Sequence, residues 1–134
     1  MPAHVHPIIV YYEDTDLTGA VYHANYLRFM ERAREHMFGV RELVQRLENG
    51  LGFVVYRCDL TFREPAVHGD HLEIHSTVKQ ESPVRLVFTQ RVRRGSGGKD
   101  LVVGKIDLVP VDASGRLVPV PADLLGAVAH YRTV

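Results

Sequence analysis

The chain has 134 residues, 46% of them hydrophobic, a length and composition that predict one globular domain over residues 1–134. Its 16 basic residues balance 16 acidic ones, so the composition excludes a broad surface for nucleic acid or anionic lipid. A single cysteine allows no internal disulfide. The sequence shows neither a signal-peptide start nor the roughly 20-residue apolar run of a membrane span. Together these observations predict a cytoplasmic protein.

The N-terminal third of the chain predicts a strand followed by a long helix. Residues 5–12 are rich in β-branched and aromatic side chains, which favour a strand. After an acidic turn, apolar residues recur in steps of three and four from Tyr26 to Leu47, and this is the helical period. We expect Gly39 to break or bend the helix and Asn49-Gly50 to end it.

Four strand patterns follow, over residues 53–63, 71–79, 84–93 and 101–111. Apolar and polar side chains alternate in the first three, whereas the fourth is apolar on both faces, as in a central strand. The connections between them are short, which predicts an antiparallel sheet. A short C-terminal helix is expected around residues 122–131.

The order of strand, long helix and further strands predicts an α+β fold. The long helix would lie across one face of a curved antiparallel sheet and cover its apolar side chains. Cys58 alternates with apolar neighbours and is expected in that core. Such a sheet has two edges, and an exposed edge invites pairing with a second copy, so we predict a homo-oligomer.

The most distinctive stretch links the first predicted strand to the long helix. It crowds acids just ahead of a helix N-terminus, where backbone N–H groups favour negative charge and polarise a carbonyl. Its residues are Asp14-Thr15-Asp16, then Gly19, then Val21-Tyr22-His23-Ala24-Asn25-Tyr26, and within the helix Glu31-Arg32-Ala33-Arg34. This pattern resembles the signature of hotdog-fold acyl-CoA thioesterases, of the 4-hydroxybenzoyl-CoA thioesterase type and the Tol-Pal-cluster type. The strand order, length and helix position are similar to that family over residues 5–131.

The resemblance implies a hotdog fold, in which a curved sheet wraps a long helix, and hydrolysis of acyl-CoA thioesters. Asp16 matches the family's catalytic aspartate, which either attacks the thioester or activates water. The family's oxyanion donor is a backbone N–H that falls on His23, although the His23 side chain is an alternative acid. Tyr22 and Asn25 of the same motif are expected to contact the substrate. Outside this motif, Asp16 would be interpreted as a turn or capping residue.

The neighbouring polar residues have expected roles of their own. Asp14 should be structural and accept hydrogen bonds from backbone N–H groups of the turn, and Glu13 should lie on the surface. Asn25 either hydrogen-bonds Asp16 or caps the helix. Another thioesterase branch uses a helix glutamate, but here we expect Glu31 to form a structural salt bridge with Arg34.

Coenzyme A carries phosphates, which arginine and lysine bind. Basic residues gather on or after the strand predicted over 84–93: Arg85, Arg91, Arg93, Arg94 and Lys99. We expect Arg91 and Arg93 to bind the substrate, and the alternative is a solvated strand face and hairpin tip. The eight histidines show no metal-ligand spacing, so no metal and no other cofactor is expected.

Two other functions remain open at this stage. One is a hotdog protein that binds an acyl thioester without hydrolysing it, and the other is a hotdog dehydratase, whose usual motif we do not find. By resemblance, the assembly would be a homotetramer built from two strand-paired dimers, with the active site at a subunit interface. Leu17 and Thr18 stand where many relatives carry a smaller residue and a second glycine. The sequence does not specify the acyl group.

Overall fold

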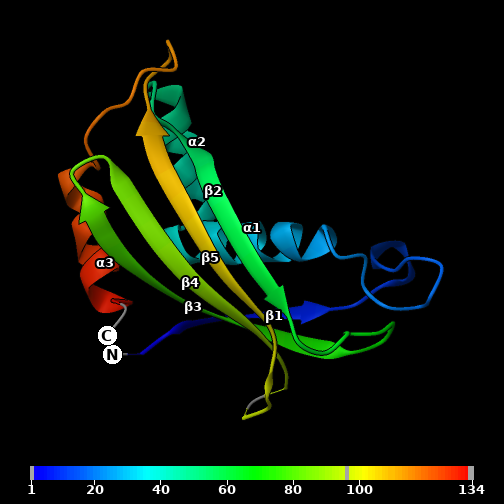
Figure 1. Ribbon diagram of the computed structural model, residues 1–134. Coiled ribbons are helices and arrows are strands. Elements are labelled where there is room, and N and C mark those ends of the chain that lie inside the picture. Colours follow the sequence, from blue (N-terminus) through cyan, green and yellow to red (C-terminus); the bar gives the residue numbers. More distant parts are fainter. Residues whose placement is uncertain (1, 96, 133–134) are drawn as a thin grey trace.

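In the computed structural model, which describes residues 2–95 and 97–132, an antiparallel sheet curves around a central helix (Figure 1). Its five strands are β1 (His4–Ile9), β2 (Gly52–Phe62), β3 (His71–Ser82), β4 (Arg85–Arg94) and β5 (Asp100–Val111). They lie in the order β1-β3-β4-β5-β2, so β1 and β2 form the two edges. β5 lies between β4 and β2, as its two apolar faces predicted.

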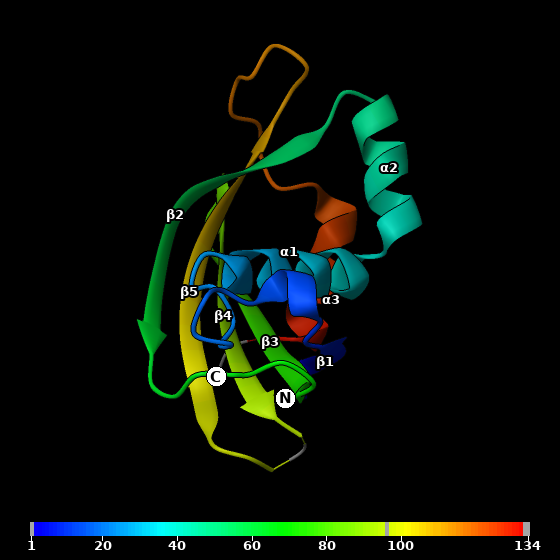
Figure 2. The same ribbon diagram turned by 90° about the vertical axis from the view of Figure 1, so that its right-hand side faces the viewer.

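The helices lie together on one side of the sheet (Figure 2). They are α1 (Asn25–Phe38), α2 (Val40–Glu48) and α3 (Leu125–His130), with short 3-10 turns at η1 (Tyr12–Asp14) and η2 (Ala122–Leu124). Gly39 has a φ of 93°, in the left-handed region that favours glycine, and it separates α1 from α2 as expected. None of the helices in residues 2–95 and 97–132 is long and apolar enough to cross a membrane. The predicted α+β class is confirmed.

The core lies between α1 and the concave face of the sheet. Its largest fully buried apolar side chains are Phe29, Met30, Leu72, Ile74, Leu86, Phe88, Leu101, Ile106, Val10, Val78 and Val92. A Cβ atom at Gly104 on β5 would meet the Sδ and Cε atoms of Met30 at 2.8 Å. Glycine at this position therefore allows α1 to approach β5 closely, and this approach fixes the depth at which the helix lies.

The first strand is shorter than predicted, because β1 ends at Ile9 rather than at residue 12. Tyr11 begins a 3-10 turn, and its backbone N–H donates to Asp14 Oδ2 at 2.9 Å. A local side-chain acceptor thus competes with the strand ladder for this N–H group. The aromatic pair Tyr11 and Tyr12, which suggested a strand, is exposed instead.

The place of β2 in the sheet makes one sequence prediction wrong, that of a core position for Cys58. β2 and β3 are consecutive in the chain but are not neighbours in the sheet, since β2 pairs with β5. The register of that pairing shifts between Val55 and Arg57, a bulge that moves the side chains of the strand from one face to the other. Cys58, predicted to be in the core, is exposed because β2 is an edge strand that the helices cover only partly.

Candidate active site

Asp16 lies in a closed turn between η1 and α1. Its backbone N–H donates to the Ala20 carbonyl at 2.9 Å, and its carbonyl accepts from Gly19 N–H at 3.0 Å. Gly19 has a φ of 82°, which this turn requires. Leu17 projects fully into solvent, so the larger residue at this position does not disturb the turn.

One oxygen of the Asp16 carboxylate is held and the other is open. Asp16 Oδ1 accepts from the Thr18 backbone N–H at 2.8 Å and from Thr18 Oγ1 at 2.6 Å. Asp16 Oδ2 accepts no hydrogen bond from the described residues. The two bonds from Thr18, followed by the nearby charge of His23, lower the pKa of Asp16 below its ordinary value. The group is therefore an ionised, fixed carboxylate with a free oxygen.

Asp14 is the structural acid of the motif, as predicted. It is buried, its Oδ2 accepts from Tyr11 N–H, and its Oδ1 accepts from Asn25 Nδ2 at 2.9 Å. Asn25 therefore neither bonds Asp16 nor caps the helix, because its side chain bonds Asp14 and Ala24 occupies the N-cap position. The Asp14 carbonyl also accepts from Tyr22 N–H at 2.9 Å, so this one residue ties η1 to the start of α1. Glu13 is exposed, as expected.

His23 stands just before α1 with its backbone N–H unpaired among the described residues. Its ring lies 4.5 Å from that of Tyr22, which is 48% exposed, and 6.4 Å from that of Phe62 on β2. His23 and Phe62 line a pocket of about 250 Å³ between the start of α1 and the end of β2, together with Tyr26, whereas Tyr22 and Asp16 are not among its lining residues. The donor and the pocket lie together, as an oxyanion site requires.

Arg91 and Arg93 lie on β4 and both bond Asp100. Arg91 Nη1 donates to Asp100 Oδ2 at 2.6 Å, and Arg93 Nε donates to Asp100 Oδ1 at 2.8 Å. Burial alone would raise the pKa of Asp100, but the two arginines outweigh it and lower that pKa. No described contact joins either arginine to Asp16, His23, Tyr22 or Asn25.

The other basic residues of the predicted cluster also lie beside acids. The pairs are Arg85 with Asp107, Arg94 with Asp70 and Lys99 with Glu64. The salt bridge expected between Glu31 and Arg34 is not among the ion pairs of the described chain. Arg34 instead points inward and donates to Gln90 Oε1 at 3.0 Å, because its long side chain reaches β4 beneath the helix.

The sequence alone assigned no role in the site to two residues that the structure places there, Thr18 and Phe62. Thr18 anchors Asp16, and the spacing of Asp followed two residues later by Thr is the usual signal of such an Asx turn. Phe62 reaches the site from β2, and only the three-dimensional fold brings it there. Across residues 2–95 and 97–132, no three His, Cys, Asp or Glu side chains gather in a way that would hold a metal ion.

A family model described as the Thioesterase-like superfamily matches residues 10–128. The acyl-CoA thioester hydrolase YbgC of Escherichia coli O6:H1 is 41% identical over 88 residues, which cover 64% of this chain and 66% of that protein, just under two thirds of its length. The acyl-CoA thioesterase YbgC of Haemophilus influenzae is 32% identical over 131 residues, 94% of each chain.

Among solved structures, Slr0204 from Synechocystis, described as a 1,4-dihydroxy-2-naphthoyl-CoA thioesterase, superposes with a TM-score of 0.87. The superposition covers 95% of this chain and 96% of Slr0204 at 21% identity. At that identity the likeness concerns the fold alone.

Proposed function

The chain belongs to the Thioesterase-like superfamily and has the hotdog fold, and on that premise we propose that it hydrolyses acyl-CoA thioesters with Asp16 as the central catalytic group. The observation that carries this proposal is the Asp16 carboxylate, anchored through one oxygen and open at the other, on the turn before the unpaired His23 N–H. The names of the relatives support the acyl-CoA substrate.

Two routes are compatible with this geometry. Asp16 Oδ2 either attacks the thioester carbonyl, releasing the CoA thiolate and leaving an acyl–aspartyl anhydride that water then hydrolyses, or it removes a proton from the water that attacks. In both routes the carbonyl oxygen gains negative charge. The His23 N–H, at the positive end of α1, would stabilise that charge.

The Asp16→Asn variant tests the proposal. Because an amide neither attacks nor takes up a proton, we expect thiol release from acyl-CoA to fall by at least about 10²-fold while the fold is kept. Asp112→Asn is the matched control, since Asp112 Oδ1 likewise accepts two backbone N–H bonds in a turn, from Ser114 at 2.9 Å and Arg116 at 3.0 Å. Wild-type turnover in Asp16→Asn would refute the role of Asp16.

Tight binding of acyl-CoA by the wild type without thiol release would indicate a binding protein, and an enoyl product would indicate a dehydratase.

The remaining motif residues have proposed supporting roles. Tyr22, exposed beside His23, would contact the substrate, and Asn25 would act through Asp14 by fixing the turn. Arg91 and Arg93 would bind the CoA phosphates, because two guanidinium groups that share the single carboxylate of Asp100 retain one positive charge.

We also propose that the chain assembles through β2 as a strand-paired dimer, and that two such dimers form a homotetramer. The outer edge of this 11-residue strand has no partner among the described residues, and Val54, Val55 and Tyr56 on it are exposed. An unpaired apolar edge favours pairing with an identical strand. Val54→Lys should lower the mass measured by sedimentation, whereas Val40→Lys, at a similarly exposed position on α2, should not. A monomeric wild type would contradict the assembly.

The proposed compartment is the cytoplasm, which the single Cys58 suits because the chain needs no oxidising environment for an internal disulfide. Fractionation of cells that places the protein elsewhere would contradict this.

A further inference from the structure

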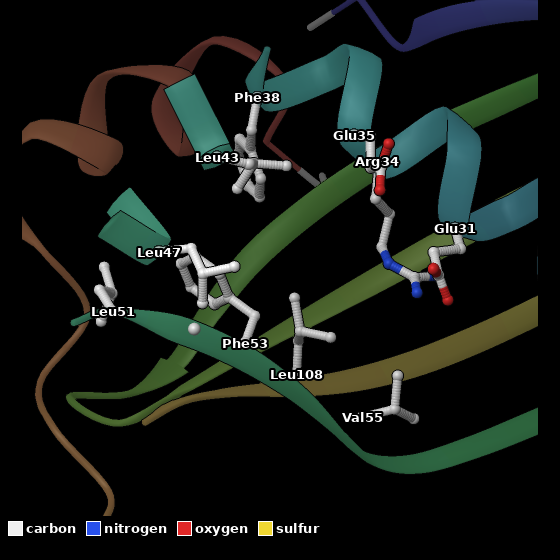
Figure 3. Close-up of a pocket in the computed structure, with 11 residues that line it drawn as sticks. Glu31, Arg34, Glu35, Phe38, Leu43, Leu47, Leu51, Phe53, Val55 and Leu108 are labelled. Atoms are coloured by element: carbon white, nitrogen blue, oxygen red, sulfur yellow. The ribbon is translucent and has the colours of Figure 1, made fainter. Parts of the chain in front are cut away.

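A second cavity, of about 320 Å³, lies between α1, α2 and the start of β2 (Figure 3). This volume falls in the range of small-molecule sites. One end is apolar, with Leu43 and Leu47 from α2 facing Phe53 from β2. The other end holds Arg34 and Glu31 from α1. The cavity is therefore an apolar chamber with a polar group at one end.

Arg34 brings unused hydrogen-bond donors to this cavity. It is only 7% exposed, and Figure 3 shows its side chain extending from α1 into the chamber. Of its five N–H donors, the structure pairs one, from Nη1 to Gln90 Oε1 at 3.0 Å. Nε and Nη2 bond no other residue of the described chain. These donors are not sealed from solvent and Arg34 lines the cavity, so an oxygen of a ligand bound there could accept from them in place of water.

Gln90 holds Arg34 in this orientation. Its Nε2 donates to the Met30 carbonyl at 2.9 Å and to Ser76 Oγ at 3.0 Å, which leaves its Oε1 to accept from Arg34. The network is buried and links α1 to two strands. The guanidinium is therefore fixed in place before any ligand arrives, as a specific site requires.

The cavity and the proposed thioester site lie on the same side of α1. Both open between α1 and β2, with His23 and Phe62 bordering the smaller pocket and Arg34 and Phe53 bordering the larger one. Arg34 follows Asn25 by nine residues, about 14 Å along the helix axis. The two pockets share no lining residue, so an acyl chain that runs along α1 from its start must span about this distance to reach Arg34.

The charges around the cavity favour a neutral ligand oxygen over a charged one. Burial lowers the pKa of Arg34, while the negative charges of Glu31 and Glu35 raise it and offset part of that effect. Both glutamates border the cavity, so with Arg34 they give this end more negative than positive charge. A ligand carboxylate would be repelled there, whereas a hydroxyl or keto oxygen would accept from Arg34 without that repulsion.

We propose that the cavity binds the distal end of the acyl chain and that Arg34 selects acyl groups bearing a neutral oxygen, hydroxyl or keto, at that end. This inference rests on the proposed thioesterase function.

Three acyl-CoAs of equal chain length test it: octanoyl-CoA, ω-hydroxyoctanoyl-CoA and the corresponding dicarboxylic acyl-CoA. For the wild type we expect kcat/KM to be highest for the hydroxyacyl substrate, by about tenfold over octanoyl-CoA, since one hydrogen bond to a charged donor supplies about 1.4 kcal/mol. The dicarboxylic substrate should be the poorest. Decanoyl and dodecanoyl sets locate the chain length at which the preference is greatest. No preference for the hydroxyl at any length would overturn the proposal without any mutation.

Arg34→Met removes the donors and keeps much of the side-chain volume, so the hydroxyacyl-to-acyl ratio of kcat/KM should fall to about one. Arg28→Met makes the same change at a position of α1 that does not line the cavity and should keep the wild-type ratio. If Arg34 serves only to tie α1 to β4, Arg34→Met will lower the rates for all substrates together and leave the ratio unchanged, which would refute the selection. A wild type that hydrolyses none of the substrates would refute the proposed function instead. Binding at the cavity would then be judged by whether free ω-hydroxyoctanoic acid raises the melting temperature more than octanoic acid does.

Discussion

Exchanging the two residues of the Asp14–Asn25 pair tests whether that contact fixes the active-site turn. In the single variant Asn25→Asp, a carboxylate faces Asp14 Oδ1 where the Asn25 Nδ2 donor stood at 2.9 Å. The alternative role for Asn25, as a residue that stabilises the start of α1, makes the opposite prediction. Aspartate in the first turn of a helix interacts favourably with the helix dipole, so the change would then be neutral or stabilising.

The magnitude follows from the geometry. The change removes a hydrogen bond to a charged group, which contributes about 1.5–3 kcal/mol. It also brings two carboxylates to about 3 Å, where the repulsion at an effective dielectric constant of 20 reaches about 5 kcal/mol before the side chains rotate apart. Allowing for that rotation, we expect unfolding free energy to fall by about 2–4 kcal/mol, or about 7–14 °C in melting temperature at the usual unfolding entropy per residue.

The double variant Asp14→Asn with Asn25→Asp should recover most of the loss. The asparagine introduced at position 14 would donate to the new carboxylate through its amide nitrogen and still accept from Tyr11 N–H through its oxygen. Urea unfolding at fixed protein concentration measures both variants beside the wild type. Asn49→Asp, exposed at the C-terminal end of α2 where the helix dipole opposes the added charge, gives an upper limit for the effect of the charge alone. Stability of Asn25→Asp equal to the wild type, or a double variant no better than the single, would refute the contact as the organising interaction.

Two further predictions concern charge. Burial and then the nearby His36 lower the pKa of His4 and His6 below their ordinary value of 6.5, so the unfolded chain binds more protons below that pH and stability falls as pH drops from 6.5 toward the lowered pKa values. His36→Asn should flatten this decline in urea unfolding, and an unchanged slope would contradict the coupling. Arg91→Gln and Arg93→Gln should each raise KM for acyl-CoA about two- to fivefold but leave it unchanged for the N-acetylcysteamine thioester, which lacks the phosphates. Arg116→Gln is the control, and an equal rise for both substrates would exclude phosphate binding.

The sequence predicted those parts of the fold that depend on local periodicity. Alternation located β2, β3 and β4, an apolar run located β5, and the helical period together with Gly39 located α1 and α2. The bulge between Val55 and Arg57 has no such signature, because apolar side chains on both sides of it continue the alternating pattern. The exposure of Cys58 likewise depends on which strand forms the edge, and this is decided by long-range pairing.

The contacts of the candidate site also fall into two kinds, those between residues close in the sequence and those between residues far apart. Asp16, Gly19 and Thr18 form a turn whose chemistry is visible within a few residues. Asn25 bonds Asp14, eleven positions away, and not Asp16, nine positions away, and Arg34 bonds Gln90 across 56 positions. Propensity and spacing carry no information about such contacts, because the fold alone brings these side chains within reach.

The exposure of the site connects the proposed chemistry to the proposed assembly. Asp16 is exposed in a single chain, and Tyr22 next to His23 and Phe62 in the smaller pocket are each about half exposed. Electrostatic stabilisation of an oxyanion is strongest where water is excluded, so one chain alone offers a weak site. β2 borders both pockets and also presents the unpaired edge, which means that a second copy paired there would cover the α1–β2 side. Val54 lies near the start of β2, at the opposite end of the strand from the pocket that Phe62 lines. Val54→Lys should therefore reduce thiol release in proportion to the loss of oligomer. A fully active monomer would show that the site needs no partner.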